Sequence, residues 1–431
     1  MPVRLVASTA RIACALSVVS LSISAIAADW PQFRGPTGLG LTDEKDLPLK
    51  WGGKENVRWQ VPLKGQGHAS PIVSGDAVFV CTVEWPTNAG PREKTMPAHH
   101  VTRYRATDGT LIWDTLAPPG PWLRTDFRSG PGGGYAAPTP ATDGKRVYCL
   151  FGSSVLAALE FDGRIAWRKE IIPYTFDVTI GASPVLFRDL VLIFCAMAKA
   201  SDSCLIAFDR VTGEEKWRAQ FPDMGFGHST PLHIEVNNRP QLLLLASGMG
   251  VKSNALRSLD PATGKVLWWC RGAGDASSPA YGTGLVYFDS GRGGAGIAVE
   301  PTGEGDVTES KVRWTIAQLP EAIGSPIIVG GYLYRLHSPG VLKCFEMASG
   351  KLVYAERLEG ISTTWASPIA DTAGHLFFAN AGKSYVLQTG PEFRVLAIND
   401  LGDGNHASPA VAGGSLILVG AKSLHCVGNT P

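Results

Sequence analysis

The sequence predicts an all-β protein, an eight-bladed β-propeller built from four-stranded antiparallel blades. Two observations lead to this prediction. A short element recurs eight times with a mean spacing of about 48 residues, which falls in the range typical of solenoids and propellers. A strand element without a partner precedes the first copy and resembles the last strand of a repeat unit. The 50 glycines and 30 prolines among 431 residues agree with a chain rich in turns.

The recurring element is a Ser, Thr or Ala followed by Pro and then by a β-branched or aromatic run. Short runs of this kind with glycine-rich borders are typical of strands. Each copy is therefore expected to begin the innermost strand of one blade. The copies start at Ser70, Ala137, Ser183, Thr230, Ser278, Ser325, Ser367 and Ser408.

A second element completes each unit, as in LDPATGKVLW, which ends at Trp268. An acidic residue can accept backbone N–H bonds in the turn, glycine supplies a positive φ, and the aromatic four residues later packs against the next sheet. Two copies depart from this pattern: Ser310 replaces the glycine before Trp314, and the copy near Gly390 lacks the aromatic. Irregular outer loops are expected in those two blades. The aromatics expected to dock one blade on another are Trp59, Trp113, Trp167, Trp217, Trp268, Trp314 and Tyr354.

The order of the elements predicts how the ring closes. The segment ENVRWQV, with Trp59, has no Ser-Pro start before it, and the chain ends soon after its last start. The N-terminal strand is therefore expected to complete the last blade, which removes exposed edge strands. Residues 55–431 then form a single domain.

Residues 1–27 are typical of a signal peptide, because Arg4 and Arg11 precede an apolar run and a small-residue cleavage site at Ala27. We expect a periplasmic or secreted monomer without a membrane span, in which residues 28–54 form a lead-in segment. Cleavage removes two arginines and leaves a formal charge of −1, which favours no nucleic-acid partner.

Seven cysteines remain after cleavage, and most lie in apolar strand-like runs, where a free thiol is a small buried hydrophobe. Cys195 and Cys204 flank an expected hairpin, and the sequence leaves open whether they form a disulfide. No zinc-type spacing of His and Cys occurs, so no metal site is expected.

The Ser-Pro start together with D-x-x-T-G-x-x-x-W resembles the PQQ-like (pyrroloquinoline-quinone-like) propeller repeat. Quinoprotein alcohol dehydrogenases and the propeller lipoprotein of bacterial outer-membrane protein assembly share this repeat. The opening DWPQFRGPTGLG, residues 29–40, is also similar to the lead-in of exported bacterial members. For the dehydrogenases, the resemblance implies a quinone held by a disulfide between adjacent cysteines, beside a calcium ion. This sequence has no adjacent cysteines and no position that maps onto the calcium ligands or the base. We therefore expect no PQQ, no calcium and no catalytic residue.

Candidate binding residues lie at the channel mouth, two positions before each blade start. Among these eight positions, aromatic and imidazole side chains are enriched, because they include His68, Tyr135, His228, Trp365 and His406. They would form a funnel for a small molecule or a peptide. Alternatively, each imidazole bonds a carbonyl of the next blade and locks the ring.

Two insertions lengthen the first blade, at residues 84–100 and 117–135, and long loops on a rigid scaffold often carry binding residues. We therefore expect an exported, non-catalytic binding or scaffolding propeller that engages a protein, a peptide or a small ligand at the channel mouth or at these loops. Two alternatives remain: a quinone- or metal-dependent oxidoreductase, and an outer-membrane protein assembly partner. The second is weakened because Cys14 lacks a lipobox context.

Overall fold

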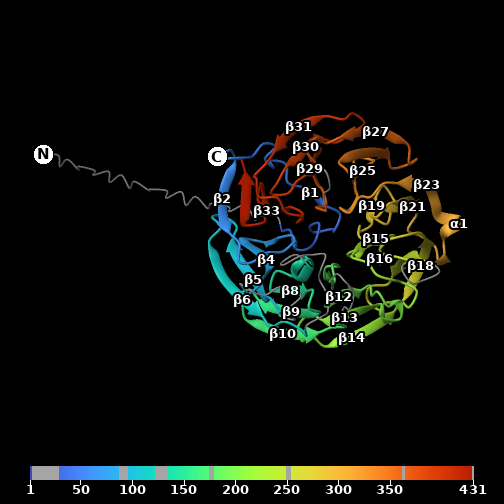
Figure 1. Cartoon of the computed structure of the whole chain (residues 1–431), viewed down its shortest axis with the longest axis horizontal. Coiled ribbons are helices and arrows are strands. Elements are labelled where there is room, and N and C mark those ends of the chain that lie inside the picture. The colour runs from blue at the N-terminus through green and yellow to red at the C-terminus, as the bar shows by residue number, and fades with distance from the viewer. Residues whose placement is uncertain are drawn as a thin grey trace.

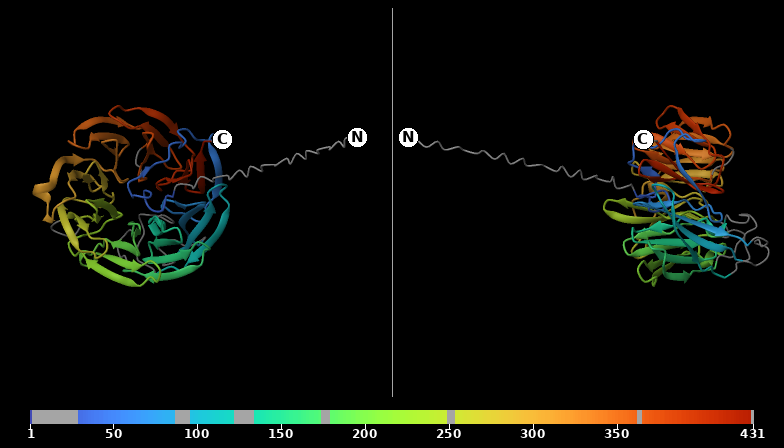
Figure 2. Two further views of the ribbon diagram at one scale, coloured as in Figure 1. Left: turned by 180° about the vertical axis from the view of Figure 1, so that it is seen from behind. Right: turned by 90° about the vertical axis from the view of Figure 1, so that its left-hand side faces the viewer.

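The computed structural model describes residue 1 and residues 29–86, 96–121, 134–173, 179–248, 254–361 and 365–429. Eight sheets surround a central axis, and edge on they form a disc that is wider than it is thick (Figures 1 and 2). The all-β eight-bladed fold is confirmed. The expected signal peptide beyond Met1, and residues 87–95 and 122–133 of the two insertions, lie outside the described residues.

Each blade has four antiparallel strands, and they follow one another from the axis outward. Blades one and two are β3 (Ile72–Ser74), β4 (Ala77–Glu84), β5 (Ala98–Arg105), β6 (Leu111–Ala117), and β7 (Ala141–Thr142), β8 (Arg146–Phe151), β9 (Val155–Glu160), β10 (Ile165–Glu170). Blades three and four are β11 (Val185–Phe187), β12 (Leu190–Cys195), β13 (Cys204–Asp209), β14 (Glu215–Gln220), and β15 (Leu232–Val236), β16 (Arg239–Leu244), β17 (Ala255–Leu259), β18 (Val266–Arg271).

The second half of the ring repeats this plan. Blades five and six are β19 (Ala280–Gly282), β20 (Leu285–Phe288), β21 (Gly294–Val299), β23 (Val312–Leu319), and β24 (Ile327–Val329), β25 (Tyr332–His337), β26 (Val341–Glu346), β27 (Leu352–Arg357). Blades seven and eight are β28 (Ile369–Asp371), β29 (His375–Phe378), β30 (Ser384–Gln388), β31 (Val395–Asn399), and β32 (Ala410–Ala412), β33 (Ser415–Val419), β34 (Ser423–Gly428), β2 (Val57–Pro62).

Strand β2 closes the ring by pairing antiparallel with β34, with Trp59 opposite Cys426 and Val61 opposite Leu424. The prediction that the N-terminal strand completes the last blade is confirmed. Residues near the start of the domain thus finish a sheet whose other three strands lie at the end of the chain. None of the described residues belongs to a helix long and apolar enough to cross a membrane.

A closed ring of eight hydrogen bonds joins the starts of the inner strands. In each blade the backbone N–H of one Ser or Thr donates to the side-chain hydroxyl of its counterpart in the next blade, over 2.9 to 3.1 Å, and all eight residues are buried. We call this set the hydroxyl ring. Its members are Ser70, Thr139, Ser183, Thr230, Ser278, Ser325, Ser367 and Ser408.

The hydroxyl ring corrects the predicted start of blade two, which is Thr139 and not Ala137. Two overlapping dipeptides, Ala137-Pro138 and Thr139-Pro140, compete for the position. Only threonine has the hydroxyl that accepts the amide proton of Ser70, so the ring selects the second dipeptide.

The outer aromatics lie over turn glycines of the following blade. Trp59 lies against Gly109, and Trp113 lies against Gly163, where φ is 73° and 92°. A Cβ atom at either glycine would lie under 3.0 Å from the indole, so the close approach requires glycine. Trp167, Trp217 and Trp314 repeat this contact on Gly213, Gly264 and Gly350. The indole N–H groups of Trp59, Trp113, Trp167 and Trp314 also donate to carbonyl oxygens of the following blade.

The expected irregularity of blade five takes a definite form. Before β23 the chain makes the short strand β22 (Gly305–Asp306), which pairs parallel with β18, and the one-turn helix α1 (Thr308–Lys311). Trp268 of blade four meets no turn glycine there. Its indole instead donates to Gln241 Oε1 of its own blade over 2.9 Å, and the side chain is fully buried.

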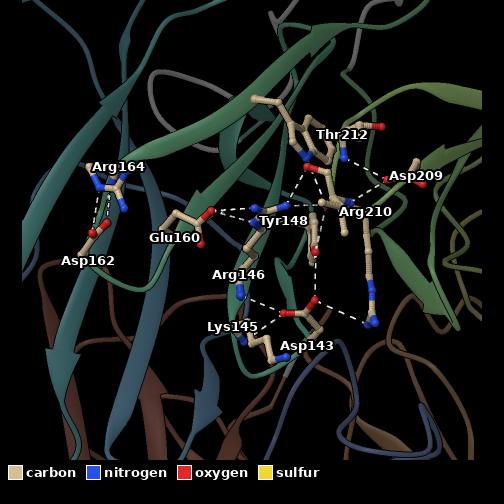
Figure 3. Close-up of polar contacts among 12 residues, drawn as sticks. Asp143, Lys145, Arg146, Tyr148, Glu160, Asp162, Arg164, Asp209, Arg210 and Thr212 are labelled. Carbon is tan, nitrogen blue, oxygen red and sulfur yellow. Dashed lines mark hydrogen bonds and ion pairs between the residues drawn. The ribbon is translucent and has the colours of Figure 1, made fainter.

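Polar side chains add a further connection between blades two and three (Figure 3). Arg146 donates to the carbonyl oxygens of Arg210 and Val211 and pairs with Glu160 of its own blade at 2.7 Å. Arg210 in turn lies 3.5 Å from Asp143. These contacts run from the β7–β8 turn and the end of β9 in blade two to the β13–β14 turn of blade three, so they add to the docking of the two blades.

The lead-in segment crosses the inner side of the ring. Trp30 forms an isolated antiparallel β-bridge with Val73 of blade one. Strand β1 (Leu41–Thr42) pairs parallel with β28 of blade seven, inside the ring in Figure 1. Between them, the buried guanidinium of Arg34 donates to the carbonyl oxygens of Pro279 and Pro326 in blades five and six. The segment therefore ties together blades that are distant in the ring.

All seven cysteines of the described residues are buried and free. Cys195 and Cys204 lie directly opposite each other on β12 and β13.

Candidate binding site at the mouth of the propeller

We call the set of residues two positions before the hydroxyl ring the mouth of the propeller. Counted from the observed ring members, these residues are His68, Ala137, Gly181, His228, Ala276, Ile323, Trp365 and His406. Four of the five predicted binding residues are among them.

Tyr135 is the exception, because the corrected start of blade two moves the mouth position to Ala137. Tyr135 instead belongs to a single 3₁₀ turn, Gly134–Ala136, and is 1% exposed. Its ring packs edge-on against Trp85, with 5.6 Å between the ring centroids. The structure therefore places Tyr135 in the hydrophobic core between blades one and two.

Three aromatic rings form a continuous row across blades seven, eight and one. Trp365 is 47% exposed and stacks on His406, with centroids 5.0 Å apart and an interplanar angle of 27°. His406 meets the edge of His68 at 5.3 Å. The row bridges the seam where β2 closes the ring.

Asn405 fixes the orientation and the proton position of His68. The Asn405 amide nitrogen donates to the carbonyls of Gly67 and Gly420, each over 2.9 Å, so its Oδ1 must be the atom that lies 2.7 Å from His68 Nδ1. Because an amide oxygen only accepts, His68 Nδ1 carries the proton. The other nitrogen, Nε2, is then an acceptor when the ring is neutral.

The pKa of His406 lies below its usual value because desolvation of the ring disfavours the charged form, and His68 adds to this effect. At neutral pH the His406 ring is therefore uncharged. An uncharged imidazole under an indole presents an aromatic face and not a cation.

His228 lies on another side of the mouth and contacts the entry to blade three. Its ring packs edge-on against Phe226 at 4.8 Å and lies directly against Gly181, where a Cβ atom would collide with it. Burial, and then the charge of Arg292, lower the pKa of His228 to about 4. Its Nδ1 is buried and has no hydrogen-bond partner among the described residues.

A charged group lies beside His228, and residue patterns alone did not reveal it. The backbone N–H of His228 donates a hydrogen bond to the backbone carbonyl oxygen of Asp275 over 2.7 Å. Its carboxylate lies 3.4 Å from Arg292 Nε, and Arg292 lies 3.7 Å from Glu321. Burial raises the pKa of Asp275, against the opposing effect of Arg292. The available signal was that Arg292 is the one charged residue in the glycine-rich run 290–296.

Backbone contacts join the charged group to the aromatic row. The N–H of Ala322 donates to Gly291 O over 2.9 Å, next to Arg292. Gly324 lies against the carbonyl oxygen of Ala366, the residue after Trp365, and a Cβ atom there would lie 2.6 Å from that oxygen. Backbone packing therefore connects the loop of Glu321 to the loop of Trp365. We call the charged group and the aromatic row together the crescent, which comprises His68, His406, Trp365, Glu321, Arg292, Asp275 and His228.

The histidines of the blade-one insertion have separate partners. His99 is buried between the carbonyl of Pro97 and the hydroxyl of Ser153, each at 2.8 Å, while His100 contacts Asp114 at 2.8 Å. Near them, a pocket of about 560 Å³ is lined by residues that include Trp85, Met96, Leu116 and Pro119.

The axis carries a buried positive charge, the guanidinium of Arg34. No group of three or more His, Cys, Asp or Glu among the described residues is arranged to hold a metal ion. Arg34 donates to the carbonyl oxygens of Pro279 and Pro326 in blades five and six. Its positive charge would repel a calcium ion at these carbonyls.

Comparison with known proteins relates the chain to one family. The family model described as outer membrane protein assembly factor BamB matches residues 97–269 and 244–427. No curated protein matches.

Several solved structures share the fold at low sequence identity. BamB from Moraxella catarrhalis aligns with a TM-score of 0.59 and 12% identity, over 86% of this chain and 99% of that chain. A europium-containing methanol dehydrogenase aligns with a TM-score of 0.65 and 12% identity, over 93% and 89%. The quinohemoprotein alcohol dehydrogenase from Comamonas testosteroni aligns with a TM-score of 0.64 and 13% identity, over 94% and 81%. Since these identities are so low, the structures show the fold alone, but the family match covers most of the chain. The chain therefore belongs to the PQQ-like propeller family whose model is described as outer membrane protein assembly factor BamB.

Proposed function

We propose that this protein is an exported, non-catalytic binding propeller that holds a protein or peptide partner at its mouth. Trp365 carries the proposal. Its indole is 47% exposed, yet its position is held by the stack on His406. A large aromatic that is exposed and already ordered binds a partner with a small loss of conformational entropy, and tryptophan is enriched among the residues that dominate interface energies.

The rest of the crescent supports this proposal. His68, held by Asn405, offers an acceptor beside the aromatic row, and Arg292 and Glu321 are about half exposed on the adjoining side. A mixture of a rigid aromatic anchor with polar groups around it is typical of a partner-binding surface.

A second candidate is participation in outer-membrane protein assembly. The family match and the alignment with 99% of the BamB chain favour it. In that case the partner at the mouth would be recovered from the membrane fraction of the native cell.

Affinity capture from the native exported and membrane fractions tests the proposal. The wild type is compared with Trp365→Ala and with the triple variant His68→Ala, His228→Ala, His406→Ala. Val211→Ala is the matched control, because Val211 is 59% exposed on the outer turn of blade three. We expect Trp365→Ala to lower recovery of the partner at least about tenfold, as loss of a dominant interface residue does. Equal recovery with Trp365→Ala and Val211→Ala would contradict the proposal.

A further inference from the structure

The mouth holds hydrogen-bond acceptors that no described donor uses. Asp275 Oδ1 is buried and has no hydrogen-bond partner among the described residues. The carboxylate of Glu321 meets Arg292 only at 3.7 Å, which is too long for a hydrogen bond. A ligand that fits these atoms is therefore a donor.

The charge of the group points to a cation. Arg292 supplies one positive charge, and Asp275 and Glu321 supply two negative charges when ionised, so the three together carry one excess negative charge. The neighbouring imidazoles do not cancel it, because His228 and His406 are uncharged at neutral pH. Asp275 is largely buried and Glu321 is about half exposed, so screening by water is weaker at Asp275 than at the open surface.

The aromatic row favours the same kind of ligand. The exposed indole of Trp365 presents the negative face of its π-system, and tryptophan is the strongest of the aromatic residues in attracting cations. Backbone contacts of Gly324 with Ala366 and of Ala322 with Gly291 connect the loop of Trp365 to the loop of Arg292. A basic side chain at Trp365 would then meet an aromatic face on the side of the ring that carries the excess negative charge.

We propose that the mouth recognises a basic side chain, lysine or arginine, of the bound partner, with Trp365 contacting the cation and Asp275 and Glu321 balancing its charge. This inference rests on the proposed function, since it names the chemistry of the partner at the same site.

Fluorine NMR of protein labelled with fluorotryptophan tests it. The Trp365 resonance is assigned by its loss in Trp365→Phe. The probes are Nα-acetyl-lysine amide, Nα-acetyl-arginine amide and Nα-acetyl-norleucine amide, the last of which has the lysine stem without its ammonium group. We expect the two basic probes to shift the Trp365 resonance saturably, and the norleucine probe to bind at least about tenfold more weakly.

The double variant Asp275→Asn, Glu321→Gln keeps the shape of the site and removes its negative charge. We expect it to weaken binding of the basic probes about tenfold. The control is Asp162→Asn, which removes an exposed charge on the outer turn of blade two, where Asp162 pairs with Arg164 (Figure 3), and which should change nothing. Unchanged resonances of the other tryptophans show that each variant is folded. The basic probe whose shift saturates at the lower concentration identifies which side chain the site prefers.

Three results would overturn the inference: equal binding of the norleucine and basic probes, no saturable shift with either basic probe, or equal affinity in the double variant and the wild type. The proposed function is tested separately, by the affinity capture described above. It is supported, whatever the NMR result, if Trp365→Ala recovers less of the partner than the wild type does. It is contradicted if Trp365→Ala recovers as much as the wild type.

Discussion

The backbone N–H of Ser408 donates to the hydroxyl oxygen of Ser70 over 3.0 Å, across 338 residues of sequence. This bond joins blade eight to blade one and completes the hydroxyl ring. It therefore lies at the same seam as the β2–β34 pairing and the row formed by Trp365, His406 and His68.

Removal of the Ser70 hydroxyl should destabilise the seam. Ser70→Ala leaves the buried N–H of Ser408 without its acceptor, which costs about 1 to 3 kcal/mol. Ser70→Thr should retain stability, because Thr139 and Thr230 already occupy equivalent ring positions. The free energy of unfolding in urea measures both. If Ser70→Ala is as stable as the wild type, the ring does not contribute to closure.

Trp59 should dominate the docking of blade eight on blade one. Its indole is 8% exposed, lies on Gly109 and donates to the carbonyl of Ala106 over 2.8 Å. Trp59→Ala should lower the free energy of unfolding by about 3 to 5 kcal/mol. Trp59→Phe keeps an aromatic face and loses the hydrogen bond, so we expect a smaller loss. Chemical denaturation tests this order, and equal losses in the two variants would argue against the packing contribution.

Arg34 should hold the lead-in segment to blades five and six. Its guanidinium bridges the carbonyls of Pro279 and Pro326, and burial, together with the charge of Arg335, lowers its pKa to about 9. Arg34→Met keeps much of the side-chain volume but leaves both carbonyls without this donor, at a cost of about 1 to 3 kcal/mol. Arg34→Lys should be intermediate, because one ammonium does not reproduce the planar fork. A Met variant as stable as the wild type in urea would show that the bridge is dispensable.

Much of the fold could be predicted because blades repeat. Each unit needs the same turn glycine, docking aromatic and strand start, so a period is visible without any alignment. The start of blade two was missed because Ala137-Pro138 and Thr139-Pro140 both match the pattern, and only the hydroxyl requirement decides between them. That error also misplaced Tyr135.

The positions of the candidate site residues were predicted in part. His68, His228, Trp365 and His406 precede strand starts, so their common position follows from the repeat. Asp275, Arg292 and Glu321 lie in connecting loops, where no periodicity applies, and only the packing of blades four to six brings them together. The role of Arg34 was hidden for the same reason, since the lead-in segment contains no repeat.

Stability should fall in mild acid. His99, His228 and His337 each have a pKa lowered to about 4, mainly because burial disfavours the charged imidazole. In the unfolded chain they titrate near 6.5, so between about pH 6.5 and pH 4 the unfolded state binds more protons than the folded state. The histidine contribution is complete above this window and is lost as the pH falls through it. Asp275 opposes the trend near the acidic end, because its pKa is raised.

Thermal unfolding across this range measures the effect. Each histidine contributes a slope of up to about 1.4 kcal/mol per pH unit within the window. His337→Gln should remove the contribution of His337 from the slope within the window and leave stability unchanged above about pH 7. A variant that follows the wild-type curve throughout would contradict the assignment of His337.

Photo-cross-linking from position 365 tests binding at the mouth most directly. A photoreactive amino acid replaces Trp365 in one protein and Val211, on the outer edge of blade three, in another. Both are exposed to the native exported and membrane fractions. The proposed function predicts one dominant cross-linked partner from position 365, abolished by excess wild-type protein, and none from position 211. The same cross-linked products from both positions, or none from position 365, would contradict binding at the mouth.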